Sequence, residues 1–333
     1  MRSACKEYVT TTATSVIKCA ALCYNSHAGV NSNSMLNLKT APFRPLRLAA
    51  LIGLLFGAVE QSPAQRGSGP VPEHGQPATL PHALEYDFTS RITGRPYRLT
   101  ITPPIHPDSA RLYPVLYVLD GTAWRATSSE IATVFGATGQ TATGYVVAIG
   151  YQTTDVVVAS ELRSLDLTPF RAPDPEDAKV TGGGDAFLRA IYEEVQPYVL
   201  SHFRIDRARQ AIWGRSLGGM LAVRSLLRDP GKFSTYLLAS PTLNRNVLAD
   251  EPAFFERVKR DDTTLRVLIT VGGEEPPSRY PLMYDEPSTF AARLQAGAPH
   301  LTVKYVVFPG EGHLPAGAMS LIRGIEFAWP RRP

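Results

Sequence analysis

The sequence predicts an α/β fold with a mostly parallel sheet of eight strands and helices on both faces. Apolar runs that are typical of buried strands recur along the chain from about residue 83. Segments with helical spacing of apolar residues lie between these runs, and such alternation indicates parallel strands joined by helices. The first two strand patterns adjoin at a Thr93-Gly94 turn, which indicates a hairpin at the start.

The strands are identified by their composition. The β-rich segments 84–93 and 95–104 form the hairpin, and the continuous apolar segments 113–120 (YPVLYVLD) and 145–152 (YVVAIGYQ) are buried strands. The other strands are expected at 209–214, 235–239, 265–271 and 301–308. In such a sheet the ligand lies outside the carboxyl ends of the strands, so functional residues are expected there.

Helices are expected where apolar residues recur every three or four positions. The segment 185–203 shows this spacing, and a breaker, Asp229-Pro230-Gly231, closes the segment 217–228. The remaining helices are expected at 129–137, 251–260, 287–296 and 316–327. Residues 153–184 show no clear strand or long helix. Because long loops inside compact domains are usually functional, we expect substrate-binding surface there.

The composition is that of an ordinary globular protein, with 44% hydrophobic and 19% charged residues. The formal net charge of +4 is too small for a dedicated nucleic-acid binder, so no nucleic-acid partner is expected. Cys5, Cys19 and Cys23 all lie near the N-terminus, which leaves the rest of the chain without a thiolate nucleophile or a disulfide framework. No run of metal-ligand spacing occurs, so neither a metal nor a cofactor is expected.

The N-terminal region has the three-part layout of a secretory signal peptide. Positive charges precede an apolar run at residues 48–59, and the small residues Ser62 and Ala64 follow it. The run is shorter than the roughly 20 residues that cross a bilayer as a helix. The alternatives are a short buried helix or an uncleaved anchor.

This layout divides the chain into four parts. If translation begins at Met35, residues 1–34 are a non-native upstream extension or a disordered segment, and residues 35–64 are the signal peptide. A linker rich in proline and glycine follows at 65–82, and the folded catalytic domain covers 83–333. We therefore expect a periplasmic or secreted protein with no stable membrane span after signal cleavage.

A candidate nucleophile lies between a predicted strand and a predicted helix. Residues 214–218 (GRSLG) fit the pattern G-x-S-x-G, with Ser216 at its centre. This pattern builds a sharp, strained turn that exposes the serine hydroxyl at a helix N-terminus. The alternative is a plain glycine-rich turn.

A serine hydroxyl needs a base to become a good nucleophile. In folds with this turn the chain order is serine, acid, histidine, and His313 lies five residues past the last predicted strand. The acid, which fixes the histidine tautomer, is expected after the penultimate strand at Glu275, with Glu274 next and Asp285 as a third choice. A Ser–His pair without an acid is the alternative.

Acyl transfer also needs donors for the oxyanion of the tetrahedral intermediate. One donor is the N–H of Leu217, and the other is the N–H of Gly121 or Thr122, in the loop after the strand at 113–120. Trp124 in the same loop would form a wall of the pocket or belong to the core.

Several blocks in order carry a resemblance to a known family. They are YPVLYVLDGTA (113–123), VVAIGYQT (146–153), RSLDLTP (163–169), GGGDAFL (182–188), FRIDRARQAIWGRSLGG (203–219), ASPTL (239–243), VGGEE (271–275) and FPGEGH (308–313). Together they resemble the esterase-D-like branch of the α/β hydrolases, in particular the esterases that cut trilactone siderophores such as enterobactin, its glucosylated forms (salmochelins) and bacillibactin.

The resemblance implies an α/β-hydrolase fold with Ser216 and His313 as the catalytic pair and backbone at Gly121 and Leu217 for the oxyanion. It also implies that Arg163 lies beside the pocket. Its guanidinium would then hold an anionic catecholate or carboxylate group, or form a surface salt bridge. The residue before the nucleophile is usually His in this branch and is Arg215 here, which changes the charge beside the turn. We expect Arg215 to contact the substrate.

These observations predict a serine carboxylesterase that acts through an acyl-enzyme on a small-molecule ester, with a ferric siderophore as a candidate. The alternatives within the same fold are a general acyl, feruloyl or S-acyl-thiol esterase and an acyltransferase. An alternative of another class is a non-catalytic ligand-binding protein on the same scaffold, because fold does not fix function.

Overall fold

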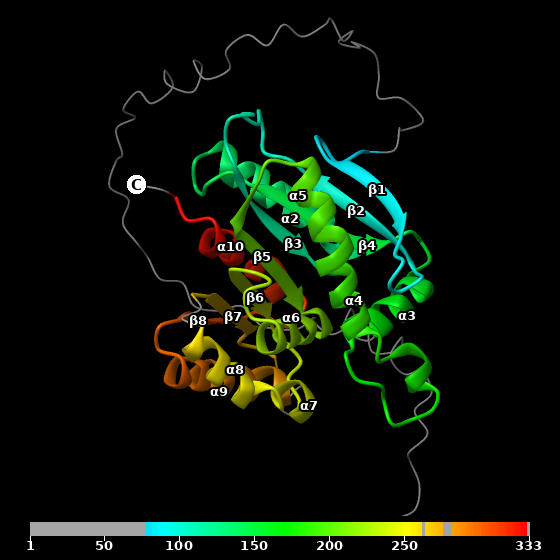
Figure 1. Ribbon diagram of the computed structural model, residues 1–333, viewed down its shortest axis with the longest axis vertical. Helices are drawn as coiled ribbons and strands as arrows, with labels where there is room; N and C mark the ends of the chain where they lie inside the picture. Colours follow the sequence, from blue (N-terminus) through cyan, green and yellow to red (C-terminus); the bar gives the residue numbers. More distant parts are fainter. Residues whose placement is uncertain (1–77, 262–263, 276–280, 332–333) are drawn as a thin grey trace, which may run out of the picture. The chain divides into compact units, whose positions relative to one another are not determined.

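The computed structural model describes residues 78–261, 264–275 and 281–331, and of residues 281–286 only the backbone (Figure 1). The predicted signal peptide, the segment before it and most of the predicted linker lie outside these residues. In the described part of the chain, no helix is long and apolar enough to span a bilayer.

One sheet of eight strands forms the centre of this part, in the order β1-β2-β4-β3-β5-β6-β7-β8. The first two strands pair antiparallel, as the predicted hairpin, and β2 pairs antiparallel with β4. Every other neighbouring pair is parallel. The strands are β1 (Leu84–Thr89), β2 (Pro96–Thr102), β3 (Tyr113–Val118), β4 (Tyr145–Tyr151), β5 (Ile205–Arg215), β6 (Thr235–Ala239), β7 (Arg266–Gly272) and β8 (Thr302–Phe308). The prediction of a mostly parallel eight-stranded sheet is confirmed.

Helices connect the parallel strands. They are α2 (Gly121–Ala137), α3 (Val156–Leu167), α4 (Gly184–Ala190), α5 (Gln196–His202), α6 (Leu217–Arg228), α7 (Arg245–Leu248), α8 (Glu251–Arg260), α9 (Pro281–Gly297) and α10 (Pro315–Ala328). A π-helical turn, η3 (Ile191–Val195), joins α4 to α5, so the helix predicted at 185–203 is one rod with a wider central turn. A short 3₁₀ turn, η2 (Asp177–Val180), precedes α4.

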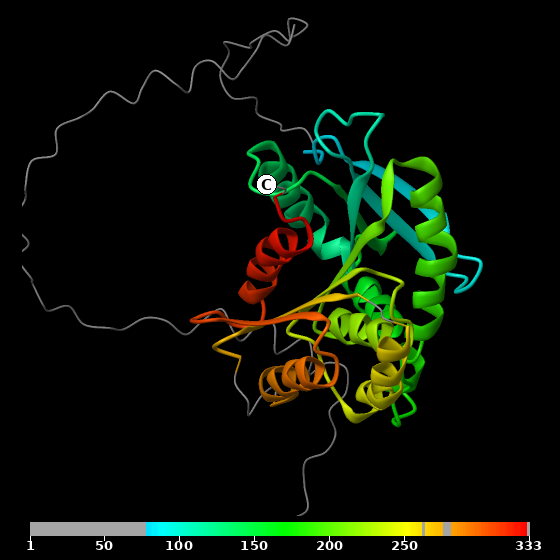
Figure 2. The ribbon, with the colours of Figure 1, turned by 60° about the vertical axis from the view of Figure 1, so that its left-hand side comes forward.

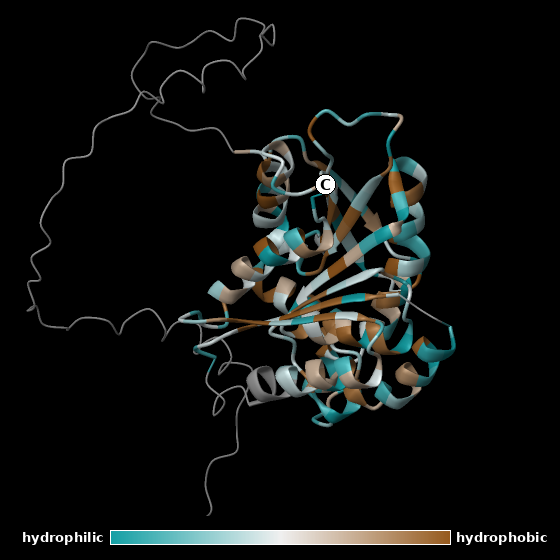
Figure 3. Ribbon diagram, turned by 90° about the vertical axis from the view of Figure 1, so that its left-hand side faces the viewer, coloured by the Kyte–Doolittle hydropathy of each residue, from teal (hydrophilic) through white to brown (hydrophobic). Residues whose placement is uncertain are grey.

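The helices form a layer on each face of the sheet. Helices α2 and α10 contact each other on one face, and α6, α8 and α9 lie on the other (Figure 2). Because side chains of a strand alternate between the two faces, Leu116 of β3 belongs to the core cluster that includes Leu321 of α10, whereas Tyr117 belongs to the larger cluster that includes Phe254 of α8. The central strands are accordingly the most apolar part of the fold (Figure 3).

The prediction that residues 153–184 hold no long helix is wrong, because α3 covers twelve of them. Asp155 begins the helix, and its carboxylate accepts hydrogen bonds from the N–H groups of Val157 (2.8 Å) and Val158 (3.2 Å). The three valines at the start of α3 are β-branched, so the sequence lacks the usual mark of a helix there.

Helix α2 is also longer than predicted, since it begins at Gly121 rather than at residue 129. Asp120 has φ 57° and ψ 38°, the left-handed conformation, which turns the chain directly from β3 into the helix. The predicted loop at 121–128 is therefore helical. The amide groups of its first turn point along the helix axis, beyond the carboxyl end of the sheet.

Candidate active site

The turn from β5 into α6 holds Ser216. Its backbone has φ 57° and ψ −115°, a conformation that strains a residue with a side chain by about 1–3 kcal/mol. A Cβ at Gly214 would overlap the backbone of Gly218, so the crossing of strand and helix requires glycine at position 214. The structure thus places Ser216 in the strained strand–turn–helix geometry that the G-x-S-x-G pattern predicts.

Backbone hydrogen bonds hold this turn in place. The N–H of Ser216 donates to the carbonyl of Ala239 at the end of β6 (3.0 Å), and its carbonyl accepts from the N–H of Thr242 (3.1 Å) and of Met220 (2.9 Å). The strain at Ser216 is therefore opposed by contacts to the neighbouring strand and to its own helix.

The loops after the last two strands bring His313 and Glu275 together. His313 Nδ1 lies 2.8 Å from Glu275 Oε2, and the Glu275 side chain is inaccessible to solvent. A carboxylate at this nitrogen places the proton on Nδ1 and leaves Nε2 as the nitrogen that can accept a proton. This pair has the geometry of the base and acid of a catalytic triad.

Glu275 is held by two further donors. The Ser240 hydroxyl donates to Glu275 Oε1 (2.6 Å), and the N–H of Gly272 donates to the same oxygen (2.7 Å). Burial alone would raise the pKa of Glu275, but the hydrogen bonds from His313, Ser240 and Gly272 outweigh it and hold this pKa below its usual value. The carboxylate is therefore ionised at neutral pH.

The two predicted glutamates have different surroundings, as their adjacent positions imply. Glu275 is 1% exposed, whereas the Glu274 side chain is exposed to solvent. The backbone N–H of Glu274 donates to the carbonyl of Glu311 (2.9 Å), which ties the acid loop to the histidine loop. The third choice, Asp285, lies in the first part of α9, at residues of which only the backbone is described.

The two predicted oxyanion donors occupy the first positions of neighbouring helices. Gly121 begins α2 and Leu217 begins α6, so the N–H groups of both have no partner within their own helices. These helices follow β3 and β5, which are paired in the sheet, and a Cβ at Gly218 would lie 3.6 Å from Leu119 Cβ. Both helix N-termini therefore meet beside Ser216.

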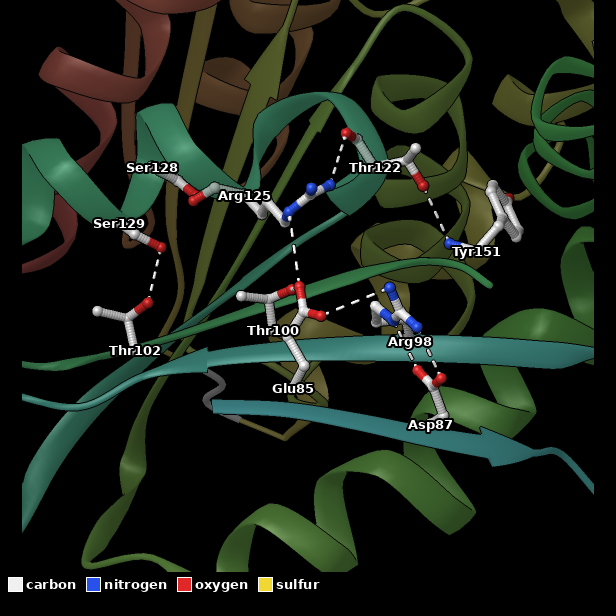
Figure 4. A network of polar contacts seen from close by, with 10 residues as sticks. All are labelled: Glu85, Asp87, Arg98, Thr100, Thr102, Thr122, Arg125, Ser128, Ser129 and Tyr151. Atoms are coloured by element: carbon white, nitrogen blue, oxygen red, sulfur yellow. Dashed lines mark hydrogen bonds and ion pairs between the residues drawn. The ribbon is translucent and has the colours of Figure 1, made fainter. Parts of the chain in front are cut away.

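Helix α2 is fixed to the sheet by polar contacts (Figure 4). The hydroxyl of Thr122 accepts a hydrogen bond from the N–H of Tyr151 at the end of β4 (3.0 Å). Further along the helix, the hydroxyl of Thr102 on β2 donates to that of Ser129 (2.7 Å). The position of Gly121 thus depends on both β2 and β4.

Arg163 pairs with Asp120 in two parallel hydrogen bonds, of 2.7 Å at Nε and 3.1 Å at Nη2. Its guanidinium therefore supports the turn before Gly121. These contacts engage two of the five N–H groups of the guanidinium and agree with the alternative of a salt bridge, whereas the contact of Arg163 to an anionic substrate group stays a prediction. Sequence reasoning missed Asp120, whose left-handed backbone has no mark in the sequence.

The other two predicted pocket residues, Trp124 and Arg215, contact each other. The Arg215 guanidinium carbon lies 5.6 Å from the centre of the Trp124 ring. Trp124 also packs edge-to-face on the buried Trp213, with ring centres 5.3 Å apart, and borders the core beneath α10. The contacts of Trp124 thus agree with the alternative that it belongs to the core.

Ser240 is a second residue that sequence reasoning missed. It directly follows β6, with a positive φ of 39°, and is 1% exposed. Its position at the carboxyl end of a parallel strand is the one signal that marked it in advance. Among the described side chains, no group of three metal ligands gathers at this site or elsewhere.

Comparisons with known proteins agree with this arrangement. The family model described as "Putative esterase" matches residues 90–296. The ferri-bacillibactin esterase BesA of Bacillus subtilis (strain 168) is 26% identical over 262 residues, which are 75% of this chain and 90% of that protein.

Solved structures show the same fold. The BES protein from Bacillus cereus covers 78% of this chain and 99% of its own, with 28% identity and a TM-score of 0.70. The enterobactin hydrolase IroE in complex with DFP covers 74% of this chain and 95% of its own, with 25% identity and a TM-score of 0.58. The chain therefore belongs to the esterase family and is a serine hydrolase with the α/β-hydrolase fold.

Proposed function

We propose that this chain hydrolyses the ester bonds of a trilactone siderophore, with Ser216 as nucleophile, His313 as general base and Glu275 as the acid of the triad. One observation carries the catalytic part of the proposal. It is the 2.8 Å contact between His313 Nδ1 and a buried, ionised Glu275, in the loops that follow the last two strands.

The reaction follows from these positions. Ser216 Oγ attacks the ester carbonyl, and its proton passes to His313 Nε2 while the new C–O bond forms. The N–H groups of Gly121 and Leu217 donate to the oxyanion. The alcohol leaves with the proton from His313. Water then attacks the acyl-enzyme by the same two steps and releases the acid and free Ser216.

Two kinds of support favour a siderophore as the substrate. BesA and IroE, which this chain resembles over most of their lengths, are named for ferri-bacillibactin and enterobactin. In addition, an apolar side chain is exposed beside the proposed site. Leu314, next to His313 in the chain, is 67% exposed. Such groups suit the aromatic rings of catecholate siderophores.

A fluorophosphonate probe tests the catalytic assignment. We expect the purified protein to be labelled and the Ser216→Ala variant to remain unlabelled. Equal labelling of both proteins would overturn the assignment of the nucleophile. The probe reacts with the serine itself, so the result does not depend on the choice of substrate.

A comparison of substrates tests the proposed specificity. We expect ferric enterobactin or ferric bacillibactin to be hydrolysed with a kcat/KM at least equal to that of short p-nitrophenyl esters. A preference for the simple esters by orders of magnitude would instead indicate a general esterase with the same catalytic residues.

We also propose that the protein is exported, with residues 35–64 as a cleaved signal peptide. The support is the order of charged, apolar and small residues in that segment. Sequencing the N-terminus of the secreted protein tests this proposal. A start at or near Gln65 is expected, and a start at Met1 would contradict it.

A further inference from the structure

Arg215, which directly precedes the nucleophile, contacts the segment that carries the catalytic histidine. Its Nη1 donates a hydrogen bond to the backbone carbonyl of His313 (3.0 Å). In a regular helix this carbonyl would accept from the N–H of Gly317, but that N–H donates to Leu314 instead (3.1 Å). The N–H of Gly317 thus does not bond to the carbonyl of His313, which accepts from Arg215.

A narrow slot holds the stem of Arg215. The Trp124 ring lies on one side of it, and α10 lies on another at Gly317. A Cβ at Gly317 would lie 2.7 Å from Arg215 Cδ and 2.8 Å from Trp124 Cη2, closer than real Cβ contacts come. Any larger residue at position 317 would therefore displace Arg215, Trp124 or α10 itself.

A hydrogen bond from the strand that carries Arg215 holds α10 beside this slot. Trp213, two residues before Arg215, is fully buried, and its indole N–H donates to the hydroxyl of Ser320 on α10 (3.1 Å). Ser320 lies one turn after Gly317, and His313 lies two residues before the first residue of α10. The docking of α10 on β5 therefore also sets the position of His313.

We propose that Arg215 is a positioning residue for catalysis, which fastens the His313 segment to the nucleophile turn from the slot formed by Trp124 and Gly317. This inference rests on the proposed function, because it assumes that His313 acts on Ser216. Among the described contacts of His313, Glu275 then anchors its ring and Arg215 its backbone. The first sets the tautomer, and the second sets the distance of the ring from Ser216.

This role differs from the one that the sequence suggested, in which Arg215 contacts the substrate. A residue that only positions His313 affects the chemical step and leaves substrate affinity unchanged, whereas a substrate contact affects KM. A shift of about 1 Å in a catalytic group costs on the order of 100-fold in rate. The two roles can thus be separated by kinetics.

The Arg215→Met variant tests the inference, because methionine fills the slot but donates no hydrogen bond. On p-nitrophenyl acetate we expect kcat to fall by about 10- to 100-fold, with KM unchanged within about 2-fold. Labelling of Ser216 by the fluorophosphonate probe should slow by the same factor. The Arg215→Lys variant retains a donor on a similar stem and should recover part of this loss.

Gly317→Ala provides a second test that leaves Arg215 in place. We expect it to lower kcat in the same way, because the added Cβ displaces Arg215 or Trp124. In the Arg215→Met/Gly317→Ala double variant the two losses should not multiply, since both act on one contact. If Arg215→Met does not fold, Gly317→Ala and Arg215→Lys, which both keep a cationic side chain at position 215, still test the inference.

The exposed Arg323→Met on α10 is the matched control and should behave as the wild type. Unchanged kcat and labelling in both folded Arg215→Met and Gly317→Ala would overturn the inference, as would a rise in KM alone, which would indicate a substrate contact. A wild-type protein that is not labelled at all would instead contradict the proposed function.

Discussion

Replacement of Glu275 by glutamine tests how much the acid contributes to catalysis. Glutamine has the shape of glutamate, but one of its two terminal atoms is a donor. The N–H of Gly272 points at Oε1 from 2.7 Å, so it requires the amide oxygen at that position. The NH₂ group must then face His313 Nδ1, 2.8 Å from Oε2 in the wild type.

This orientation reverses the histidine tautomer. With a donor opposite it, Nδ1 becomes the acceptor, and the proton moves to Nε2, which can no longer accept the proton of Ser216. In a serine protease the equivalent change lowers kcat by about 10,000-fold, which corresponds to about 5 kcal/mol of transition-state stabilisation. We expect a loss of about 1,000- to 10,000-fold in Glu275→Gln.

The assay is the kcat for p-nitrophenyl acetate together with the rate of fluorophosphonate labelling. Glu274→Gln is the matched control, because it makes the same change on the adjacent, exposed side chain, and we expect wild-type rates for it. A loss of less than about 10-fold in folded Glu275→Gln would refute the reasoning, because the enzyme would then work with Ser216 and His313 alone.

The remaining predictions concern the groups around the site. Ser240→Ala removes one donor to Glu275, so we expect its pKa to rise and the protein to lose about 2 kcal/mol of stability at pH 7. Because the native pKa of Glu275 lies below the usual 4.5, the stabilisation by Ser240 is present above about pH 4.5 and is lost as the pH falls through the native pKa. Urea unfolding of the wild type and of Ser240→Ala at pH 7 and below pH 4 measures how the loss of stability depends on pH. An equal loss at both pH values would contradict this prediction. Arg163→Met leaves the buried Asp120 carboxylate without its partner, so we expect urea unfolding to show a larger destabilisation than in Arg163→Met/Asp120→Asn. We expect KM to be unchanged, and a raised KM would instead support a substrate-binding role for Arg163. Asp155→Ala removes the N-terminal cap of α3 and should cost about 1 kcal/mol of stability by the same measurement, whereas no loss would show that the cap is dispensable.

The succession of strands along the chain and the place of each motif could be predicted because parallel strands are buried on both faces. Such strands appear in the sequence as continuous apolar runs, and the functional groups follow directly after them. Helix α6 has the predicted bounds, since the nucleophile turn starts it and a proline-containing breaker ends it. The local sequence determines each of these features by itself.

The remaining features depend on partners that are distant in the sequence. Arg163 meets Asp120 across 43 residues, and Arg215 meets His313 across 98. No local pattern shows that these guanidinium groups are engaged within the protein, so the sequence predicts substrate contacts for both, with a surface salt bridge as the alternative for Arg163. The choice between Glu274 and Glu275 likewise depends on contacts that no local pattern shows. The N–H of Gly272 and the hydroxyl of Ser240 both donate to Glu275.

The strand order explains why the site needs so many contributors. Side by side at the carboxyl edge lie β3, β5, β6, β7 and β8, and each is followed by one component of the site. In that order the components are Gly121, Ser216, Ser240, Glu275 and His313. Neighbouring strands are about 4.8 Å apart, so β8 lies about 14 Å from the nucleophile strand.

In the proposed mechanism, His313 therefore reaches back across two strands to act on Ser216. Glu275 from β7 supports the histidine ring on this path, and Ser240 from β6 supports Glu275 in turn. Arg215 reaches from the nucleophile strand in the opposite direction and holds the backbone of His313. We therefore expect a change at any one of these positions to alter the distance between Ser216 and His313. The geometry of catalysis is thus a property of the sheet edge as a whole.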